Sequence, residues 1–199
     1  MLLFAKQRLV LLAVPKTGST AWTAALASRA DMVFRGPPGI KHMSLRRYQR
    51  HIAPLLETAG APALETVAVI REPEDWLGSW YRYRQRPAVE GQPVSTKGVS
   101  FDAFVQAYLC DDRPAYADLG RQARFVAPIK GRRGVDHLFR YDDPDGLRRF
   151  VEGRLGGPIT LPRRNESPVM ALTLSAQTRA LLRRDCAADY ALYDGVSKD

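Results

Sequence analysis

The sequence predicts an α/β protein with a central parallel sheet flanked by helices, a three-layer sandwich. Short apolar runs alternate with segments of helical periodicity along its 199 residues, which is the order expected of parallel strands and the helices that connect them. The apolar run at residues 67–70 is rich in β-branched residues, as is typical of a strand buried on both faces. Apolar runs of this chain end in polar loops just before helical segments, and ligands of such folds bind at these carboxyl ends of strands.

The individual elements follow from local patterns. In the first half of the chain we expect, in order, a strand at 9–14, a helix at 19–29, an extended segment at 32–34, a helix at 44–60 broken near Pro54, a strand at 66–70 and a helix at 74–84. In the second half we expect a polar loop at 86–99, helices at 101–110 and 116–122, strands at 124–128 and 137–140, and helices at 144–155 and 175–193.

The junction between the first strand and the first helix carries the strongest functional signal. The apolar strand passes directly into the loop Pro15-Lys16-Thr17-Gly18-Ser19-Thr20. The N–H groups and the dipole of a helix N-terminus favour an anion at this point. Gly18 lets the backbone approach a ligand, Ser19 and Thr20 add hydroxyl donors, and Lys16 adds a positive charge. We therefore expect a phosphate-like group here, the alternative being a polar turn and a capped helix without a ligand.

This loop differs from the common nucleotide-binding loops. The ATP/GTP loop reads G-x-x-x-x-G-K-[ST], whereas Lys16 stands two residues before Gly18. The dinucleotide fingerprint G-x-G-x-x-G is missing as well. The order of residues 15–20 instead resembles the 5′-phosphosulfate loop of sulfotransferases that use 3′-phosphoadenosine-5′-phosphosulfate (PAPS). The resemblance implies that these six residues bind the 5′-phosphosulfate of the donor.

A second motif resembles the same family. Arg71 follows the strand at 66–70 directly, and Ser79 lies about two turns into the next helix, so a guanidinium and a hydroxyl could converge on one phosphate. The pattern Arg71-x-Pro73-x5-Ser79-x-Tyr81 resembles the 3′-phosphate site of these sulfotransferases. The resemblance implies that Arg71 and Ser79 hold the 3′-phosphate. The alternatives are a surface ion pair for Arg71 and a solvated helix position for Ser79.

The rest of the chain resembles the family less specifically. Residues 122–126, 135–142 and 161–167, with the last helix, resemble the later regions of bacterial and carbohydrate-directed sulfotransferases. The likeness thus spans nearly the whole chain and implies the sulfotransferase fold, which is related to that of P-loop nucleotide hydrolases. Cytosolic small-molecule sulfotransferases also carry a late Arg-Lys-Gly loop, but the segment Lys130–Gly134 stands elsewhere in this chain. We describe it only as a basic loop.

The predicted chemistry needs in-line geometry and charge stabilisation more than a covalent step on the protein. Negative charge grows on the leaving 5′-phosphate, by analogy with phosphoryl transfer. Lys16 is placed to neutralise it with the loop N–H groups, an arrangement that requires no metal. His42, between a Gly/Pro turn and a helix, is the candidate general base, as a His is in many sulfotransferases. Its alternative is a capping or packing role, and loop 86–99 is expected to be an acceptor lid or a disordered insertion.

Composition and charge limit the domain number, the location and the partners that we expect. A hydrophobic content of 45% over 199 residues predicts one domain, 1–199, with a substantial core. The apolar run Leu9–Val14 is too short for a membrane span or a signal-peptide core, so we expect a cytoplasmic protein. The net charge of +9 suits an anionic donor, although most of it is expected on solvated helices. Nucleic acid is disfavoured as a partner because aromatic and basic residues are interleaved only in the helical segment 76–86. Its aromatic residues are expected to pack against the sheet or to line an acceptor cleft.

Three functional hypotheses follow. The leading one is a PAPS-dependent sulfotransferase that acts on a hydroxyl or amine of a carbohydrate, lipid or small metabolite and releases 3′,5′-adenosine bisphosphate (PAP). A P-loop-type nucleotide or small-molecule kinase fits less well, because G-K-[ST] is missing and no apolar strand ends in an Asp that could hold Mg²⁺. The third is a non-catalytic nucleotide or polyanion binder. The identity of the acceptor and the oligomeric state are left open.

Overall fold

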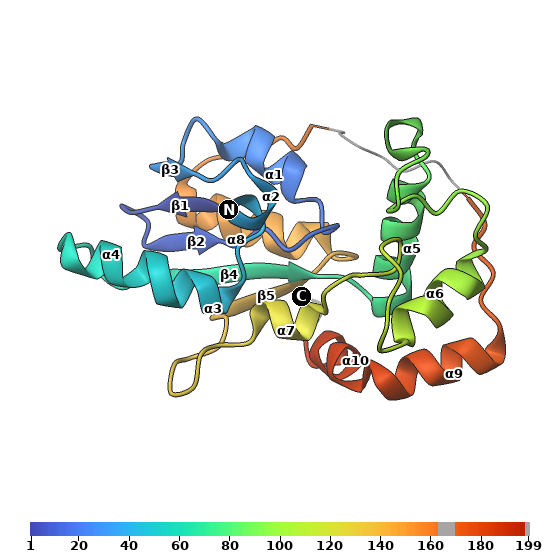
Figure 1. Ribbon diagram of the computed structural model, residues 1–199. Helices are drawn as coiled ribbons and strands as arrows, with labels where there is room; N and C mark the ends of the chain where they lie inside the picture. The colour runs from blue at the N-terminus through green and yellow to red at the C-terminus, as the bar shows by residue number, and fades with distance from the viewer. Residues whose placement is uncertain (163–169, 198–199) are drawn as a thin grey trace. The chain divides into compact units, whose positions relative to one another are not determined.

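The computed structural model describes residues 1–162 and 170–197 (Figure 1). Within these residues, contacts between Cα atoms divide the chain into two compact units. The first unit contains residues 1–71, 122–162 and 195–197, and the second contains residues 72–121 and 170–194. Residues 163–167, part of a segment that resembles the sulfotransferases, lie outside the described residues.

The first unit is built on a mixed sheet, which confirms the α/β class. Within the described residues the sheet has five strands, in the order β3-β1-β2-β4-β5. Their bounds are β1 Leu2–Phe4, β2 Leu9–Leu11, β3 Met32–Val33, β4 Glu65–Ile70 and β5 His137–Arg140. The neighbours β2, β4 and β5 run parallel, with Leu11 opposite Val67 and Val67 opposite His137. The carboxyl ends of these strands therefore meet at one edge of the sheet.

The sheet is not parallel throughout, because β1, a strand that the sequence did not predict, runs antiparallel to both β2 and β3. The turn between β1 and β2 is closed by a 3.0 Å hydrogen bond from the N–H of Arg8 to the carbonyl of Ala5. A connection this short permits only an antiparallel pair, since a parallel pair needs a crossover of a dozen or more residues. The sequence did not predict β1, which is only three residues long and short for a strand.

Helices pack on both sides of the sheet. The helices α1 (Ser19–Leu26) and α8 (Pro144–Leu155) pack on one face, where Trp22 and Leu147 join strand residues in one apolar cluster. Val10 and Ala68, whose side chains point to the other face, are buried as well. In Figure 1, α3 (Leu45–Arg47) and α7 (Gln122–Val126) lie in front of the sheet, and α8 lies behind it.

Several elements of the first unit differ from the predicted ones. The expected helix 44–60 consists of α3, a π-helical turn η1 (Tyr48–Ile52) and α4 (Ala53–Thr58), and the short α2 (Pro38–Lys41) precedes it. The strand expected at 124–128 is wrong, because residues 122–126 form helix α7. A short apolar run such as Phe125-Val126 does not distinguish a strand from a helix turn, and burial of Val126 is satisfied in either form.

The second unit is helical. It contains α5 (Pro73–Arg84), the 3₁₀ turn η2 (Pro87–Val89), α6 (Phe101–Leu109), α9 (Ala176–Asp185) and α10 (Ala187–Asp194). Its core is aromatic, with Tyr81, Phe101 and Phe104 in mutual edge and stacked contacts. The last predicted helix is interrupted at Cys186, where α9 ends. In the described part of the chain, none of the helices combines the length and the apolar composition that crossing a bilayer requires.

Two further predictions concern this unit. The helix expected at 116–122 is wrong, and the carbonyls of Ala115 and Tyr116 accept hydrogen bonds from the Arg84 guanidinium. Loop 86–99 is held against α5 at its end, because Thr96 is fully buried and donates from its N–H to the carbonyl of Arg84 over 3.1 Å. The Tyr81 hydroxyl, in turn, donates to the carbonyl of Val99 over 2.7 Å.

Candidate anion-binding site

The predicted anion-binding loop is a tight turn between the first parallel strand and α1. Residues 12–14 continue β2 as buried extended chain, and the N–H of Leu12 donates to Val67 of β4 over 2.8 Å. Pro15, Lys16, Thr17 and Gly18 then form the turn. The Thr17 hydroxyl is buried and donates to the carbonyl of Val14 over 2.9 Å, which fixes the loop from within.

The backbone of this turn is left-handed at two positions. Gly18 has a φ of 75° and is the N-cap of α1, and Lys16 has a φ of 66°. A left-handed conformation suits glycine but is unfavourable for lysine by roughly 1–2 kcal/mol. Such strain in a residue with a Cβ often marks a functional constraint. Among the described residues no side chain caps α1 at Gly18, so the first N–H groups of the helix are available to an anion.

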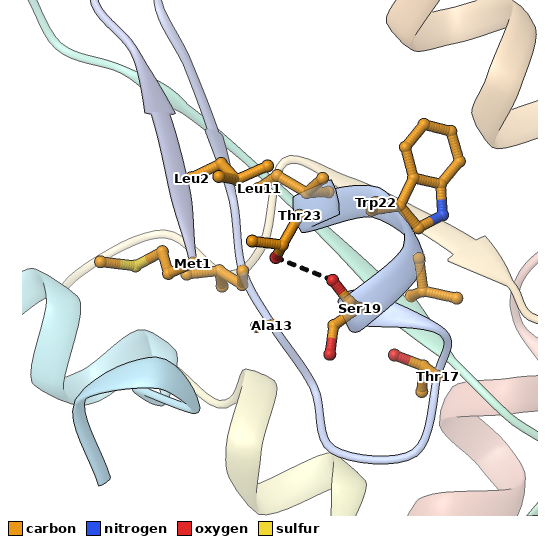
Figure 2. Close-up of a pocket in the computed structure, with 10 residues that line it drawn as sticks. Met1, Leu2, Leu11, Ala13, Thr17, Ser19, Trp22 and Thr23 are labelled. Carbon is orange, nitrogen blue, oxygen red and sulfur yellow. Dashed lines mark hydrogen bonds between the residues drawn. The ribbon is translucent and has the colours of Figure 1, made fainter. Parts of the chain in front are cut away.

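Figure 2 shows Thr17 and Ser19 at the start of α1, beside a small cavity under the loop. The cavity measures about 10 Å³ and is walled mainly by apolar residues such as Leu11, Leu12 and Val69. This space suffices for about one water molecule. The Thr23 hydroxyl donates to the backbone carbonyl of Ser19 over 2.8 Å, a bond within α1 (Figure 2). The cavity is therefore too small for a nucleotide, and the candidate site is the loop and the helix end.

Arg71 lies beside this loop. It follows β4 directly, and its guanidinium donates to the carbonyl of Lys16 over 3.2 Å. Lys16 and Arg71 therefore come from the carboxyl ends of neighbouring parallel strands and meet in the structure. The side chain of one predicted site residue thus contacts the backbone of another, and the binding of a donor by either residue stays a prediction.

Two residues that the sequence analysis did not assign to the site hold Arg71 in place. Gln122, at the start of α7, accepts from the Arg71 N–H over 2.9 Å and donates to the Arg71 carbonyl over 2.7 Å. The Arg71 guanidinium also lies 4.2 Å from the ring centre of Tyr141. Tyr141 directly follows β5, just as Arg71 directly follows β4. A Cβ atom added to Gly18 would lie 3.4 Å from the Tyr141 ring, so this ring is packed against the loop. The position of Tyr141 directly after a predicted strand was the signal that could have identified it.

The segment with the candidate base also reaches the loop. The Lys41 ammonium donates to the Thr20 hydroxyl over 3.3 Å, so a second lysine stands at the N-terminus of α1. His42 follows α2 as its C-cap, and its Nδ1 lies 2.7 Å from the carbonyl oxygen of Ala13. The chain at 41–42 is thereby fixed beside the strand that leads into the loop.

The surroundings of His42 define its protonation. A carbonyl oxygen only accepts hydrogen bonds, so Nδ1 of His42 carries a proton and, in the neutral ring, Nε2 carries the lone pair. Burial lowers the pKa of His42 below its usual value of 6.5, and the positive charge of Lys41 lowers it further, against the opposing effect of the Ala13 carbonyl. The ring is therefore neutral at pH 7 and able to accept a proton at Nε2.

Ser79 belongs to the second unit. It lies on α5 with an exposed fraction of only 5%, so it is not the solvated helix position that the sequence left as an alternative. Helix α5 begins at Pro73, one residue before the predicted start, and the Glu72 carboxylate caps it by accepting from the N–H of Asp75 over 2.7 Å. The contact of Ser79 with the same phosphate as Arg71 stays a prediction.

The first unit thus gathers basic groups at the uncapped N-terminus of α1. Lys16 lies in the turn before α1, the Lys41 ammonium at the end of α2 contacts the Thr20 hydroxyl, and the Arg71 guanidinium contacts the Lys16 carbonyl. The dipole of α1 favours negative charge at this end. Such an arrangement can bind a phosphate or a phosphosulfate. Comparison of the chain with protein-family models, with curated proteins and with solved structures finds no match.

Proposed function

We propose that the protein is a PAPS-dependent sulfotransferase, which transfers the sulfuryl group from PAPS to a hydroxyl or amine acceptor. The proposal combines the resemblance of two sequence motifs with the geometry of the first of them. One observation supports it above all: the left-handed Lys16 offers its carbonyl to Arg71, so residues of both motifs meet at the start of α1.

In this proposal each group of the loop has a distinct task. The N–H groups at the start of α1 bind the 5′-phosphosulfate, and the hydroxyls of Ser19 and Thr20 add donors. The Lys16 ammonium neutralises the charge that develops on the leaving 5′-phosphate when the S–O bond breaks. Arg71 binds the 3′-phosphate of the donor, together with Ser79.

His42 is the proposed general base. As the acceptor oxygen or nitrogen forms its bond to sulfur, its proton passes to Nε2 of His42, and PAP leaves with the electrons of the broken S–O bond. The hydrogen bond between Nδ1 and the Ala13 carbonyl holds the tautomer with its lone pair on Nε2. The lowered pKa keeps that nitrogen unprotonated at neutral pH.

Thermal unfolding with added nucleotides tests the donor assignment without knowledge of the acceptor. PAP without metal should raise the melting temperature, because a ligand at a hundred times its Kd stabilises the folded state by about 2.7 kcal/mol. ATP with Mg²⁺ and heparin serve as competing ligands. The matched variants are Lys16→Ala and Arg71→Ala, with the exposed Arg50→Ala as the control.

The outcomes separate the three hypotheses. Stabilisation by PAP that is lost in Arg71→Ala and kept in Arg50→Ala supports the proposal. Stabilisation by ATP only in the presence of Mg²⁺ would instead indicate a kinase. A shift with heparin and with neither nucleotide would indicate a polyanion binder. Turnover of labelled PAPS with a library of hydroxyl and amine acceptors then tests the transfer itself.

A further inference from the structure

A second pocket lies at the opposite edge of the same sheet. It has a volume of about 550 Å³, within the range of small-molecule sites. Its walls include residues just before or at the start of the parallel strands, namely Arg8 before β2, Glu65 and Thr66 in β4, and Asp136 and His137 at β5. The anion-binding loop follows the ends of these strands, so the two sites are separated by the length of β4, about 20 Å at roughly 3.3 Å per residue.

The carboxylates in this pocket already have partners in the protein. Glu65 accepts from the Arg154 guanidinium over 2.7 Å and lies 2.7 Å from Nε2 of His137. Asp136 accepts from the N–H and the hydroxyl of Thr66 over 2.8 and 2.9 Å. Glu57 lies 3.7 Å from the Arg132 guanidinium. Glu65 and Glu57 are therefore paired with guanidinium groups, whereas Asp136 is held by the neutral donors of Thr66.

Two guanidinium groups of the wall differ from the carboxylates. Among the described residues, the Arg133 side chain has no hydrogen-bond or ion-pair partner, and Arg8 uses only its Nε, which donates to the carbonyl of Ala63 over 3.2 Å. The backbone that carries Arg133 is held firmly. Gln49 donates to the Arg133 carbonyl over 2.7 Å and accepts from the Ile129 N–H over 3.0 Å. The basic loop 130–134 thus presents Arg133 to this pocket.

Tyr48 adds a hydroxyl group to the wall, on a side chain that is largely buried. Only 3% of its surface is exposed, yet its hydroxyl makes no hydrogen bond to any of the described residues. It lies on the π-helical turn η1, and π turns are often found at functional sites. Burial and the nearby carboxylates of Glu57 and Asp136 raise the pKa of Tyr48 to about 12. The hydroxyl therefore keeps its proton and can donate to a ligand.

We propose that this pocket binds a small organic anion, with its acid group on Arg8 and Arg133, an acceptor oxygen on the Tyr48 hydroxyl, and an apolar body on Leu56 and Pro62. The apolar part of the wall contains these two side chains together with Ala53, Ala63 and Leu64. Pairing of a carboxylate, phosphate or sulfate with guanidinium groups is the favoured recognition of such acids. The site is independent of the proposed sulfuryl transfer, because it shares no residue with the anion-binding loop.

The test uses benzoate and phenyl phosphate as probes, with benzyl alcohol as the neutral analogue, and measures binding by ligand-observed NMR. Tyr48→Phe removes the hydroxyl and keeps the packed ring, and Arg133→Gln removes an exposed charge. The first should weaken anion binding about 2- to 10-fold and the second about 10-fold or more, as expected for a neutral and a charged hydrogen bond. The controls are Arg50→Gln, on the same turn and outside the pocket wall, and Lys16→Ala at the other edge.

Saturable binding of either anion that weakens in Tyr48→Phe and Arg133→Gln but not in the two controls supports the site. Binding of benzoate alone or of phenyl phosphate alone distinguishes a carboxylate ligand from a phosphate ester. The proposal is wrong if neither anion saturates up to about 10 mM, an affinity below the useful range, or if benzyl alcohol binds equally well. It is also wrong if Lys16→Ala removes the binding, since the probes would then occupy the loop.

Discussion

The two edges of one sheet differ in how their charged side chains are arranged. At the carboxyl ends of β2, β4 and β5, basic groups gather around an uncapped helix end. At the starting edge, acidic and basic side chains are interleaved and partly neutralise one another, as in the contact of Glu65 with Arg154. Strand direction explains part of this contrast, because a helix that follows a parallel strand begins at its carboxyl end and brings a positive dipole to that edge alone.

Both edges share one backbone feature. Within the described residues, the non-glycine positions with a left-handed backbone are Arg8, with a φ of 53°, and Lys16, with a φ of 66°. One stands immediately before β2 and the other shortly after it. Arg8 closes a hairpin turn, where such a conformation is common in the type of turn that joins antiparallel strands. Lys16 lies in a loop that has no hairpin to close, so its strain is better explained by the function of the loop.

Substitution of each residue by glycine separates the two explanations. Glycine relieves the left-handed strain in both places, so neither Lys16→Gly nor Arg8→Gly should lower the free energy of unfolding by more than about 1 kcal/mol. Lys16→Gly should nevertheless reduce sulfuryl transfer about 10²- to 10³-fold, the scale of one lost contact to developing charge. Arg8→Gly should leave transfer unchanged. Steady-state assays with labelled PAPS and urea unfolding measure the two quantities, and full turnover in Lys16→Gly would remove its catalytic role.

Arg71 should contribute to donor binding more than to the chemical step. Removal of the guanidinium in Arg71→Ala should weaken PAP binding by about 1.5–3 kcal/mol, a 10- to 100-fold loss. Arg71→Lys keeps the charge but loses the planar fork and the contact with the Tyr141 ring, so its affinity should be intermediate. Calorimetric titration with PAP measures the series. Equal PAP affinities of Arg71→Ala and the wild type would show that Arg71 does not bind the donor and only forms the hydrogen bond to the Lys16 carbonyl.

The lowered pKa of His42 predicts that the free energy of unfolding depends on pH. Its pKa is lowered in the folded protein, so below pH 6.5 the unfolded chain binds the proton more readily than the folded chain. The stabilisation is complete above the unfolded pKa and is lost as the pH falls from 6.5 through the lowered folded value. His42→Gln should remove this component, and its unfolding free energy should decline less between pH 7 and pH 5 than that of the wild type. Parallel declines in urea unfolding would contradict the assignment.

The sequence pointed to a candidate site at the carboxyl ends of the parallel strands and to none at the edge where these strands begin. The reason is physical. The anion-binding loop is one continuous segment, and a strand that ends in Lys, Gly, Ser and Thr before a helix specifies both its geometry and its charge. Its distant supports Gln122 and Tyr141 were missed as site residues, because their roles depend on which strands are neighbours. The second pocket combines a hairpin turn, a π turn and a basic loop. No local pattern records that the side chain of Gln49 holds the loop of Arg133.

The smallest predicted effect concerns Glu65, which is charged and well partnered but lies far from the anion-binding loop. Hydrogen bonds from Arg154 and His137 lower the pKa of Glu65 to about 2, so its stabilisation is present above the unfolded value near 4.5 and is lost as the pH falls toward 2. The side chain is 40% exposed, and solvent screening limits the effect of Glu65→Gln at pH 7 to about 1 kcal/mol or less. PAP affinity should not change. A loss of PAP binding in Glu65→Gln, measured beside urea unfolding of the same variant, would show that the two edges are coupled through β4 and would end the distinction between them.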